Sequence, residues 1–121
     1  MPTMSIDFIQ WLHQAFYEHL PDELLWVSTA SGDKRVQVVP GVFRKAGEDV
    51  EVGVHIPPRG DIKQFLERFI KAYVLEGKGA LQKLIIAAAS HHRLLWIHPF
   101  LDGNGRVARL FSYAVLCDKR A

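Results

Sequence analysis

Cysteine is nearly absent from this chain, because Cys117 is the only one among 121 residues. A single cysteine excludes an intramolecular disulfide and a zinc site built from cysteines. Long hydrophobic runs are also missing: the longest, around residues 84–89, has the length of a core helix and is too short to span a bilayer. No N-terminal apolar run resembles a signal peptide. We therefore expect a cytoplasmic protein that does not associate with membranes.

A strong excess of one charge sign is missing too. The formal net charge is +2, so the overall balance does not favour nucleic acid or a membrane surface as a partner. The composition is 49% hydrophobic and 23% charged, which is typical of an ordinary globular protein. The length suits one domain with a single modest core. We expect one domain over residues 1–121, in which any anion site depends on local placement.

Helical spacing of apolar residues predicts the first two helices. Residues 5–19 form an amphipathic pattern, with Ser5 as the expected N-cap. A second helix is expected after Pro57-Pro58. One face of that helix carries Ile62, Phe65, Leu66, Phe69, Ile70 and Tyr73.

Two further helices flank a glycine-rich segment. Residues 81–97 are apolar nearly all round, which is typical of a central, buried helix. Pro99 cannot continue that helix. Residues 98–105 are expected to form a loop, and residues 106–116 a fourth helix. The fold predicted is mainly α, with this loop between two central helices.

One β-hairpin is predicted among the helices. Residues 28–35 indicate an exposed loop, and residues 36–39 are β-prone before Pro40-Gly41. Residues 42–44 and 50–54 then indicate two short strands around a turn.

The segment from residue 98 to residue 109 combines several features that favour a phosphate ligand. Gly103 and Gly105 allow close backbone approach, and the N–H groups of a loop before a helix can form an anion site. Arg106 and Arg109 lie three residues apart on one helix face, where two cations at a helix N-terminus require an anionic partner.

The same segment carries groups suited to a metal and to proton transfer. Asp102 offers a hard carboxylate oxygen for Mg²⁺ shared with phosphates. His98 is the one group in the loop able to accept a proton near neutral pH. Taken singly, a Gly-Asn-Gly is usually a turn, paired arginines can bridge to acidic side chains, and a histidine can be a core residue. Together, within twelve residues, they favour a nucleotide site.

This segment resembles the signature of the Fic family, His-x-Phe-x-Asp/Glu-Gly-Asn-Gly-Arg-x-x-Arg. Every defining position matches, by His98, Phe100, Asp102, Gly103, Asn104, Gly105, Arg106 and Arg109. Upstream, residues 40–44 resemble the family's Gly-x-Tyr/Phe-Arg sequence before its hairpin flap. The resemblance covers roughly residues 40–116 and is weaker in the first helix. It implies a Fic-type helical domain with a β-hairpin flap.

The resemblance implies a protein adenylyltransferase, which transfers AMP from ATP to a Ser, Thr or Tyr hydroxyl of a target protein with Mg²⁺ as cofactor. His98 would be the general base and Asp102 the metal ligand, while Phe100 would anchor the loop in the core. The phosphates would be held by Gly103, Asn104, Gly105, Arg106 and Arg109.

The implied flap would dock the target segment beside the nucleotide, because an exposed strand edge can pair with an extended peptide. The expected target-binding residues are Val50, Val52, Gly53 and Val54. A plain structural hairpin is the alternative.

Two other functions stay open. A Doc-like protein kinase carries lysine at the position of Gly105, so this glycine argues against it. A non-catalytic nucleotide-binding regulatory module needs no base, so His98 argues against that. No autoinhibitory Ser/Thr-x-x-x-Glu-Gly/Asn motif is found, because Ala72 stands where Glu76-Gly77 would require Ser or Thr. We expect a fragment, inhibited by a partner or by a segment outside this chain; a homodimer stays open.

Other histidines and basic residues have simpler interpretations. His91 and His98 lie seven residues apart, about 10 Å along a helix axis, which is too far for one zinc ion. His91 is expected to make a structural hydrogen bond near the motif. The basic pairs Lys34-Arg35 and Arg44-Lys45 are interpreted as solvated surface.

Overall fold

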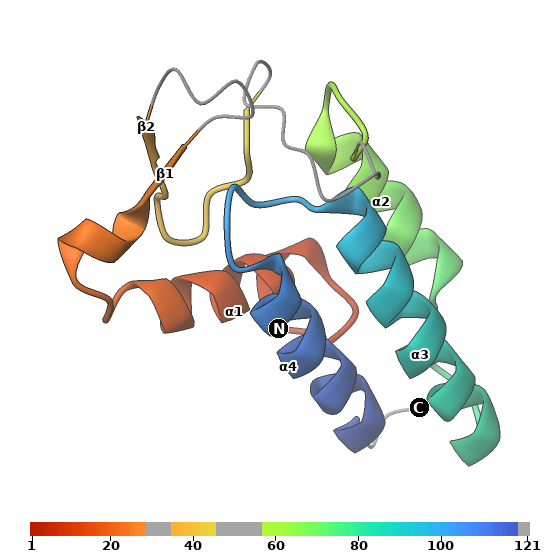
Figure 1. Ribbon diagram of the computed structural model, residues 1–121. Coiled ribbons are helices and arrows are strands. Elements are labelled where there is room, and N and C mark those ends of the chain that lie inside the picture. The colour runs from red at the N-terminus through yellow and green to blue at the C-terminus, as the bar shows by residue number, and fades with distance from the viewer. Residues whose placement is uncertain (29–34, 46–56, 119–121) are drawn as a thin grey trace.

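The computed structural model describes residues 1–28, 35–45 and 57–118. Figure 1 shows helices α3 and α4 side by side, with α2 against α3 and with α1 crossing near the start of α4. The expected mainly helical fold is confirmed. The elements are α1 (Ile6–Tyr17), the 3-10 helix η1 (Asp22–Leu25), β1 (Trp26–Ser28), β2 (Arg35–Gln37), α2 (Ile62–Ala72), α3 (Ala80–Ile97) and α4 (Asn104–Cys117).

The first two helices begin at side-chain caps. The hydroxyl of Ser5 accepts a hydrogen bond from the backbone N–H of Phe8 at 3.1 Å, as its predicted role as N-cap requires. The carboxylate of Asp61 accepts the N–H of Lys63 at 3.0 Å, so α2 starts four residues after the proline pair. Both helices therefore begin where a short acceptor side chain satisfies a first-turn donor.

The core lies where the apolar faces of the four helices meet. The predicted face of α2 is confirmed, since Ile62, Leu66 and Phe69 are buried and the other members of that face are partly buried. The remaining buried apolar residues of this core are Ile9, Leu12, Leu75, Ala87, Leu94, Ile97, Phe100, Val107, Ala108, Phe111 and Val115. The core thus includes a residue of the glycine-rich loop itself, Phe100.

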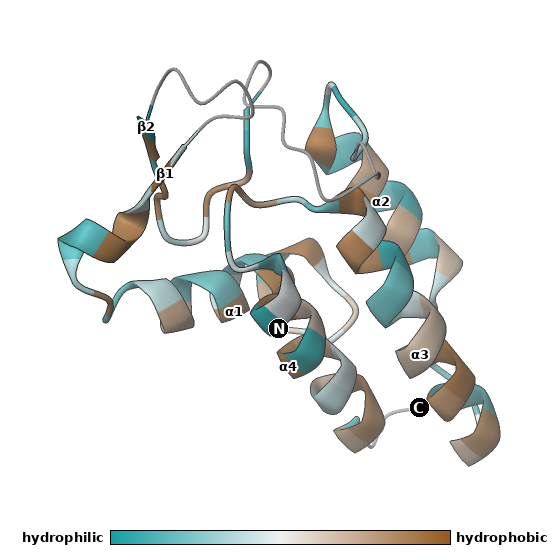
Figure 2. Cartoon of the chain, viewed as in Figure 1, coloured by the Kyte–Doolittle hydropathy of each residue, from teal (hydrophilic) through white to brown (hydrophobic). Residues whose placement is uncertain are grey.

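Helix α3 is only half buried, so the prediction of burial all round is wrong. Leu81, Leu84 and Ile85 are 71%, 55% and 59% exposed. The covered residues of the helix, Leu94 among them, face α2 and α4, and nothing in the described part of the chain packs on the opposite side. Figure 2 shows the hydrophobic colouring of the first turns of α3 at the edge of the molecule.

The antiparallel strand pair of the described residues lies before the predicted hairpin, and its second strand overlaps the β-prone residues 36–39. β1 pairs with β2 in the register Trp26 with Gln37, so the two strands lie at the two ends of the loop expected over residues 28–35. Residues 42–45 form no strand, because the N–H of Arg44 donates to the carbonyl of Pro99 at 2.9 Å instead of to a neighbouring strand. The second predicted strand, 50–54, lies outside the described residues.

A tight turn joins β2 to the residues that reach the loop. The N–H of Val42 donates to the carbonyl of Val39 at 3.1 Å across Pro40-Gly41. Gly41 has φ +79°, which is the backbone that the third residue of a type II turn requires after proline. After this turn, the chain runs toward the loop between α3 and α4, where the N–H of Arg44 meets the carbonyl of Pro99.

The contrast within α3 gives a matched test of the core. We expect Leu94→Ala, at a side chain only 1% exposed, to lower the free energy of unfolding by about 2–5 kcal/mol. Leu84→Ala removes the same atoms from an exposed site of the same helix and is expected to change it by about 0.5 kcal/mol or less. Urea denaturation of the two variants measures both values. Equal losses would contradict this orientation of α3.

Candidate active site

The loop begins at His98, which ends α3 in a left-handed conformation. Its φ and ψ are 53° and 61°, and it is the sole non-glycine residue with positive φ in the described ranges. Such backbone is uncommon outside glycine and persists only where surrounding contacts hold it. Pro99 follows and prevents another helical turn. The sharp turn leaves the half-buried His98 at the start of the loop.

Arg44 holds this turn from the other side. Its guanidinium Nε donates to the carbonyl of His98 at 2.7 Å, and Nη2 donates to the carbonyls of Ile97 at 3.1 Å and Pro58 at 2.6 Å. A cation at a helix C-terminus also interacts favourably with the helix dipole. The interpretation of Arg44 as solvated surface is therefore wrong, because its side chain is only 4% exposed. Its neighbour Lys45 is exposed.

The middle of the loop is closed by Phe100 and Asn104. The amide of Asn104 accepts from the N–H of Phe100 at 2.9 Å and donates to its carbonyl at 2.8 Å. The Phe100 ring is fully buried and stacks on His13, with ring centres 3.9 Å apart. The Asn104 side chain is thus used inside the loop, and only its backbone N–H is available to a ligand.

His13 of α1 joins the loop to the turn at residue 41. Its Nδ1 accepts the N–H of Gly41 at 2.9 Å, so the proton of the neutral ring lies on Nε2. Nε2 therefore donates to the backbone carbonyl of Asp102 at 3.0 Å. Burial lowers the pKa of His13, and the hydrogen bond and the charge of Asp102 offset this in part. If Nδ1 were also protonated, its N–H would face the N–H of Gly41, and the hydrogen bond between them would be lost.

Tyr17, one helical turn after His13, contacts the Asp102 side chain. Its hydroxyl donates to Oδ2 of Asp102 at 2.7 Å. Burial and the Asp102 carboxylate raise the pKa of Tyr17 well above its usual range, so the phenol stays protonated. Gly103 fits beside this ring only as glycine, because its φ is +84° and a Cβ there would lie 2.4 Å from Cε2 of Tyr17.

Helix α4 starts without a side-chain cap. It begins at Asn104, two residues earlier than predicted, and no side chain accepts from its first N–H groups. Arg109 folds back toward this end, since a Cβ on Gly105 would lie 3.4 Å from Arg109 Nη1. The Arg106 guanidinium lies 4.9 Å from the centre of the Phe16 ring. Unpaired N–H groups and a guanidinium at one helix start are the elements of an anion site.

The donor set around Asp102 fits a magnesium ion shared with a ligand. One carboxylate oxygen is bonded to Tyr17, which leaves Oδ1 for a metal. No group of three or more His, Cys, Asp or Glu side chains that could hold a metal is found in the described ranges. A site with one carboxylate suits Mg²⁺, which commonly takes its other ligands from phosphates and water.

Comparison with known protein families finds a model that matches this sequence over the motif loop. The sequence model of the Fic/DOC family matches residues 3–116, which includes the first helix as well as the motif. The chain belongs to the Fic/DOC family. It is 42% identical over 77 residues to proteins named protein adenylyltransferase Fic from Drosophila sechellia and Drosophila melanogaster, and 40% identical to the one from Drosophila grimshawi. The aligned part covers 63% of this chain and only 15–16% of those relatives.

His91 lies behind the Fic motif and has a structural hydrogen bond, as expected. Its Nδ1 lies 2.7 Å from the hydroxyl of Ser112, which donates in turn to the carbonyl of Ala108 at 2.9 Å. Ser112 therefore accepts from His91, and the bond joins α3 to α4. No helix in the described part of the Fic domain is long and apolar enough to cross a membrane.

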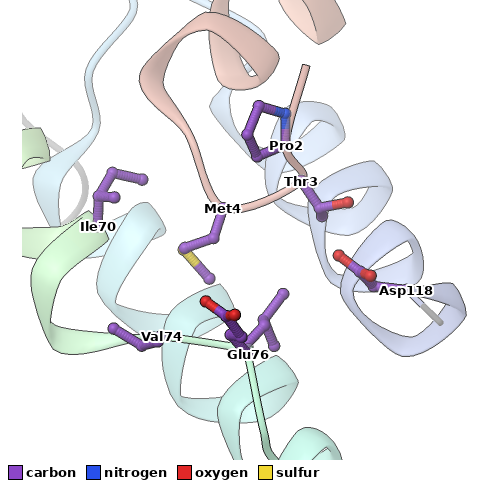
Figure 3. A pocket seen from close by; sticks show the side chains of 8 residues that line it. Pro2, Thr3, Met4, Ile70, Val74, Glu76 and Asp118 are labelled. Carbon is purple, nitrogen blue, oxygen red and sulfur yellow. The ribbon is translucent and has the colours of Figure 1, made fainter. Parts of the chain in front are cut away.

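One cavity of the Fic domain is away from the motif. It measures about 520 Å³, and Figure 3 shows Met4, Ile70, Val74 and Glu76 around it, with Asp118 at the far side. A second cavity of about 390 Å³ lies between α2 and α3 and reaches Ile97. Neither of these two cavities is lined by a residue of the motif from His98 to Arg109.

Sequence reasoning missed three residues that hold the Fic motif: His13, Tyr17 and Arg44. The predicted site residues from His98 to Arg109 do gather at one loop, whereas the predicted flap residues Val50, Val52, Gly53 and Val54 lie outside the described residues. A signal was present for all three: Arg44 is the arginine of the Gly-x-Tyr/Phe-Arg sequence, and the first helix carries the other two. His13 and Tyr17 are four residues apart on the same face as buried Ile9, so polar groups interrupt an apolar face.

His13 gives the domain a predicted pH dependence. Because its pKa in the fold is lowered, its contribution to stability is full above the ordinary value of 6.5 and is lost as pH falls through the lowered value. We expect the metal-free domain to lose unfolding free energy as the pH falls below the ordinary value of 6.5. Chemical denaturation across this range, with EDTA present, measures it.

In the variant His13→Gln, the unfolding free energy is expected to lose this dependence on pH. The variant His92→Gln, at an exposed position of α3, is expected to keep it. Persistence of the full slope in His13→Gln would assign the pH dependence to another group.

Proposed function

We propose that this Fic domain transfers AMP from ATP to a side-chain hydroxyl of a target protein. The observation that carries the proposal is the arrangement of the loop. His98 lies at one end of it, held by Arg44, and the uncapped start of α4 with Arg109 lies at the other. A histidine that could accept a proton and donors that could bind an anion thus lie on one short, well-anchored segment. The names of the Drosophila relatives support the same activity.

The phosphates would be bound by backbone and arginine donors. The first-turn N–H groups of α4, at Asn104, Gly105 and Arg106, point along the helix axis toward an incoming anion. Arg109, folded back over Gly105, would bind the terminal phosphate, and Arg106 an inner one. Phosphoryl-type transfer depends mainly on such positioning and charge stabilisation.

Asp102 would hold Mg²⁺, which when bound neutralises charge on the phosphate oxygens. His98 would take the proton of the target hydroxyl. The hydroxyl oxygen then forms a bond to the α-phosphorus, the bond from that phosphorus to the β-phosphate oxygen breaks, and pyrophosphate leaves. Arg44 keeps the His98 backbone fixed during this step, because it holds the carbonyl of the same residue.

The surroundings of Gly105 favour AMP transfer over a Doc-like kinase. A lysine there would start its side chain 3.4 Å from Arg109 Nη1, in the space that this guanidinium uses. The ammonium group of such a lysine would also have to share this region with the Arg109 guanidinium, and like charges repel. With glycine, Arg109 can lie across the helix start, so that the terminal phosphate binds at α4 and the α-phosphate is left for attack.

Replacement of the base is the most direct test. We expect His98→Ala to lower AMP transfer by about 10²–10⁴-fold, because the hydroxyl would lose its proton acceptor. Nucleotide affinity should change little, since the imidazole acts on the hydroxyl. Mass spectrometry of a lysate incubated with ATP and Mg²⁺ reads the product: added AMP supports the proposal, and added phosphate indicates a kinase.

His92→Ala, at an exposed histidine of the same helix, is the matched control and should transfer AMP at the wild-type rate. Undiminished transfer by His98→Ala would remove His98 from the reaction.

The two arginines should be separable by the nucleotide used. We expect Arg109→Ala to weaken ATP binding by about 1.5–3 kcal/mol, the value of a charge-assisted hydrogen bond. Its effect on ADP should be smaller, because ADP lacks the terminal phosphate. Arg106→Ala should weaken both nucleotides similarly. Calorimetric titration measures these affinities, with Arg68→Ala on α2 as a control; equal losses of ATP and ADP in Arg109→Ala would contradict its assignment.

A further inference from the structure

The hydroxyl of Tyr17 contacts a carboxylate of the motif and lies near a guanidinium. It donates to Oδ2 of Asp102 at 2.7 Å, and the nearby Arg106 guanidinium acts on the pKa of the same phenol, lowering it. Arg106 also packs over the ring of Phe16, the residue before Tyr17. The end of α1 therefore contacts the residue proposed to hold the metal and a residue proposed to hold a phosphate.

The Tyr17 ring is itself fixed. It is 1% exposed, stacks on His13 with ring centres 4.4 Å apart and meets the edge of Phe16 at 5.4 Å. Gly103 packs so closely against it that no Cβ fits between them. The hydroxyl cannot shift without moving this packing, so the atoms bonded to it are held in place as well.

A neutral hydroxyl at this point has two consequences. The hydroxyl binds Oδ2 of Asp102 and thereby fixes the direction in which Oδ1 points. This direction matters because Mg²⁺ demands nearly ideal octahedral geometry. The hydroxyl also lies near both an anionic and a cationic side chain of the motif. No direct ion pair joins Asp102 and Arg106 in the described residues. Without the phenol, the carboxylate and the guanidinium could pair with each other and no longer face a ligand.

We propose that Tyr17 is a positioning residue of the nucleotide–metal site: its hydroxyl aims Asp102 at the metal and keeps Arg106 apart for a phosphate. The inference rests on the proposed function, because it takes a magnesium–nucleotide as the ligand. Hydrogen-bond partners of metal ligands typically change metal affinity by about 10–100-fold when removed. Tyr17 touches neither the target nor the reacting atoms.

The test uses Tyr17→Phe, which removes one oxygen and keeps the ring. Binding of a fluorescent ATP analogue is measured by anisotropy, once with excess EDTA and once with excess Mg²⁺. The ratio of the two dissociation constants is the metal enhancement of binding. We expect Tyr17→Phe to lower this enhancement by about 10-fold or more. Tyr113→Phe, at a tyrosine 70% exposed on α4, should leave it unchanged.

A second variant separates positioning from a merely structural role. Asp102→Asn leaves α1 untouched and should by itself abolish the enhancement. In that background, Tyr17→Phe should then have no further effect on the ratio. A structural role would weaken binding alike with EDTA and with Mg²⁺, and equally in both backgrounds. Melting curves of all variants confirm that folded domains are compared.

The outcomes distinguish this inference from the proposed function. An unchanged enhancement in Tyr17→Phe, or no enhancement in the wild type, overturns the role of Tyr17. Adenylyl transfer is measured separately on the wild type. If transfer is absent while the enhancement depends on Tyr17 and Asp102 together, the positioning role stands and the transferase assignment falls.

Discussion

The shape of the motif loop depends on one neutral imidazole. His13 accepts from Gly41 with one nitrogen and donates to Asp102 with the other, while its ring lies between the rings of Tyr17 and Phe100. These partners belong to three parts of the chain: the first helix, the turn at residue 41 and the motif loop. The loop is therefore built on the first helix, whose sequence carries none of the Fic signature.

Two other polar side chains complete the support. Arg44 satisfies carbonyls that the end of α3 leaves without helical partners, and the Asn104 amide satisfies both backbone groups of Phe100. In the described ranges, no buried side-chain nitrogen or oxygen is left without a partner. Such complete pairing limits the conformations open to the loop, because any shift would leave a buried polar group unpaired. Rigidity of this kind is what a site that works by positioning needs.

Much of this could be predicted from sequence where the signal is local. The caps, the apolar face of α2 and the position of the loop all follow from spacing and from residue type. Burial of α3 could not be predicted, because periodicity reports which residues are apolar and not how many neighbours cover them. The strand predicted over residues 42–44 is absent although these residues are β-prone, because their backbone meets the loop at Pro99. Arg44 illustrates the same limit: its charge suggests a surface, and only the fold shows that it meets a helix end.

The Arg44 side chain has a consequence for how this domain can vary. Arg44 precedes residues 45–57 in the chain, and its guanidinium donates to the carbonyl of Pro58, which follows them. The same guanidinium donates to the carbonyl of His98, so both ends of this segment are held near the backbone of His98. Lengthening or rewriting that segment would leave its anchor points in place, since loop closure grows costlier only slowly with length. Segments of different length could thus follow Arg44 while His98 keeps its position. Arg44 would make the backbone position of His98 independent of the length of that segment.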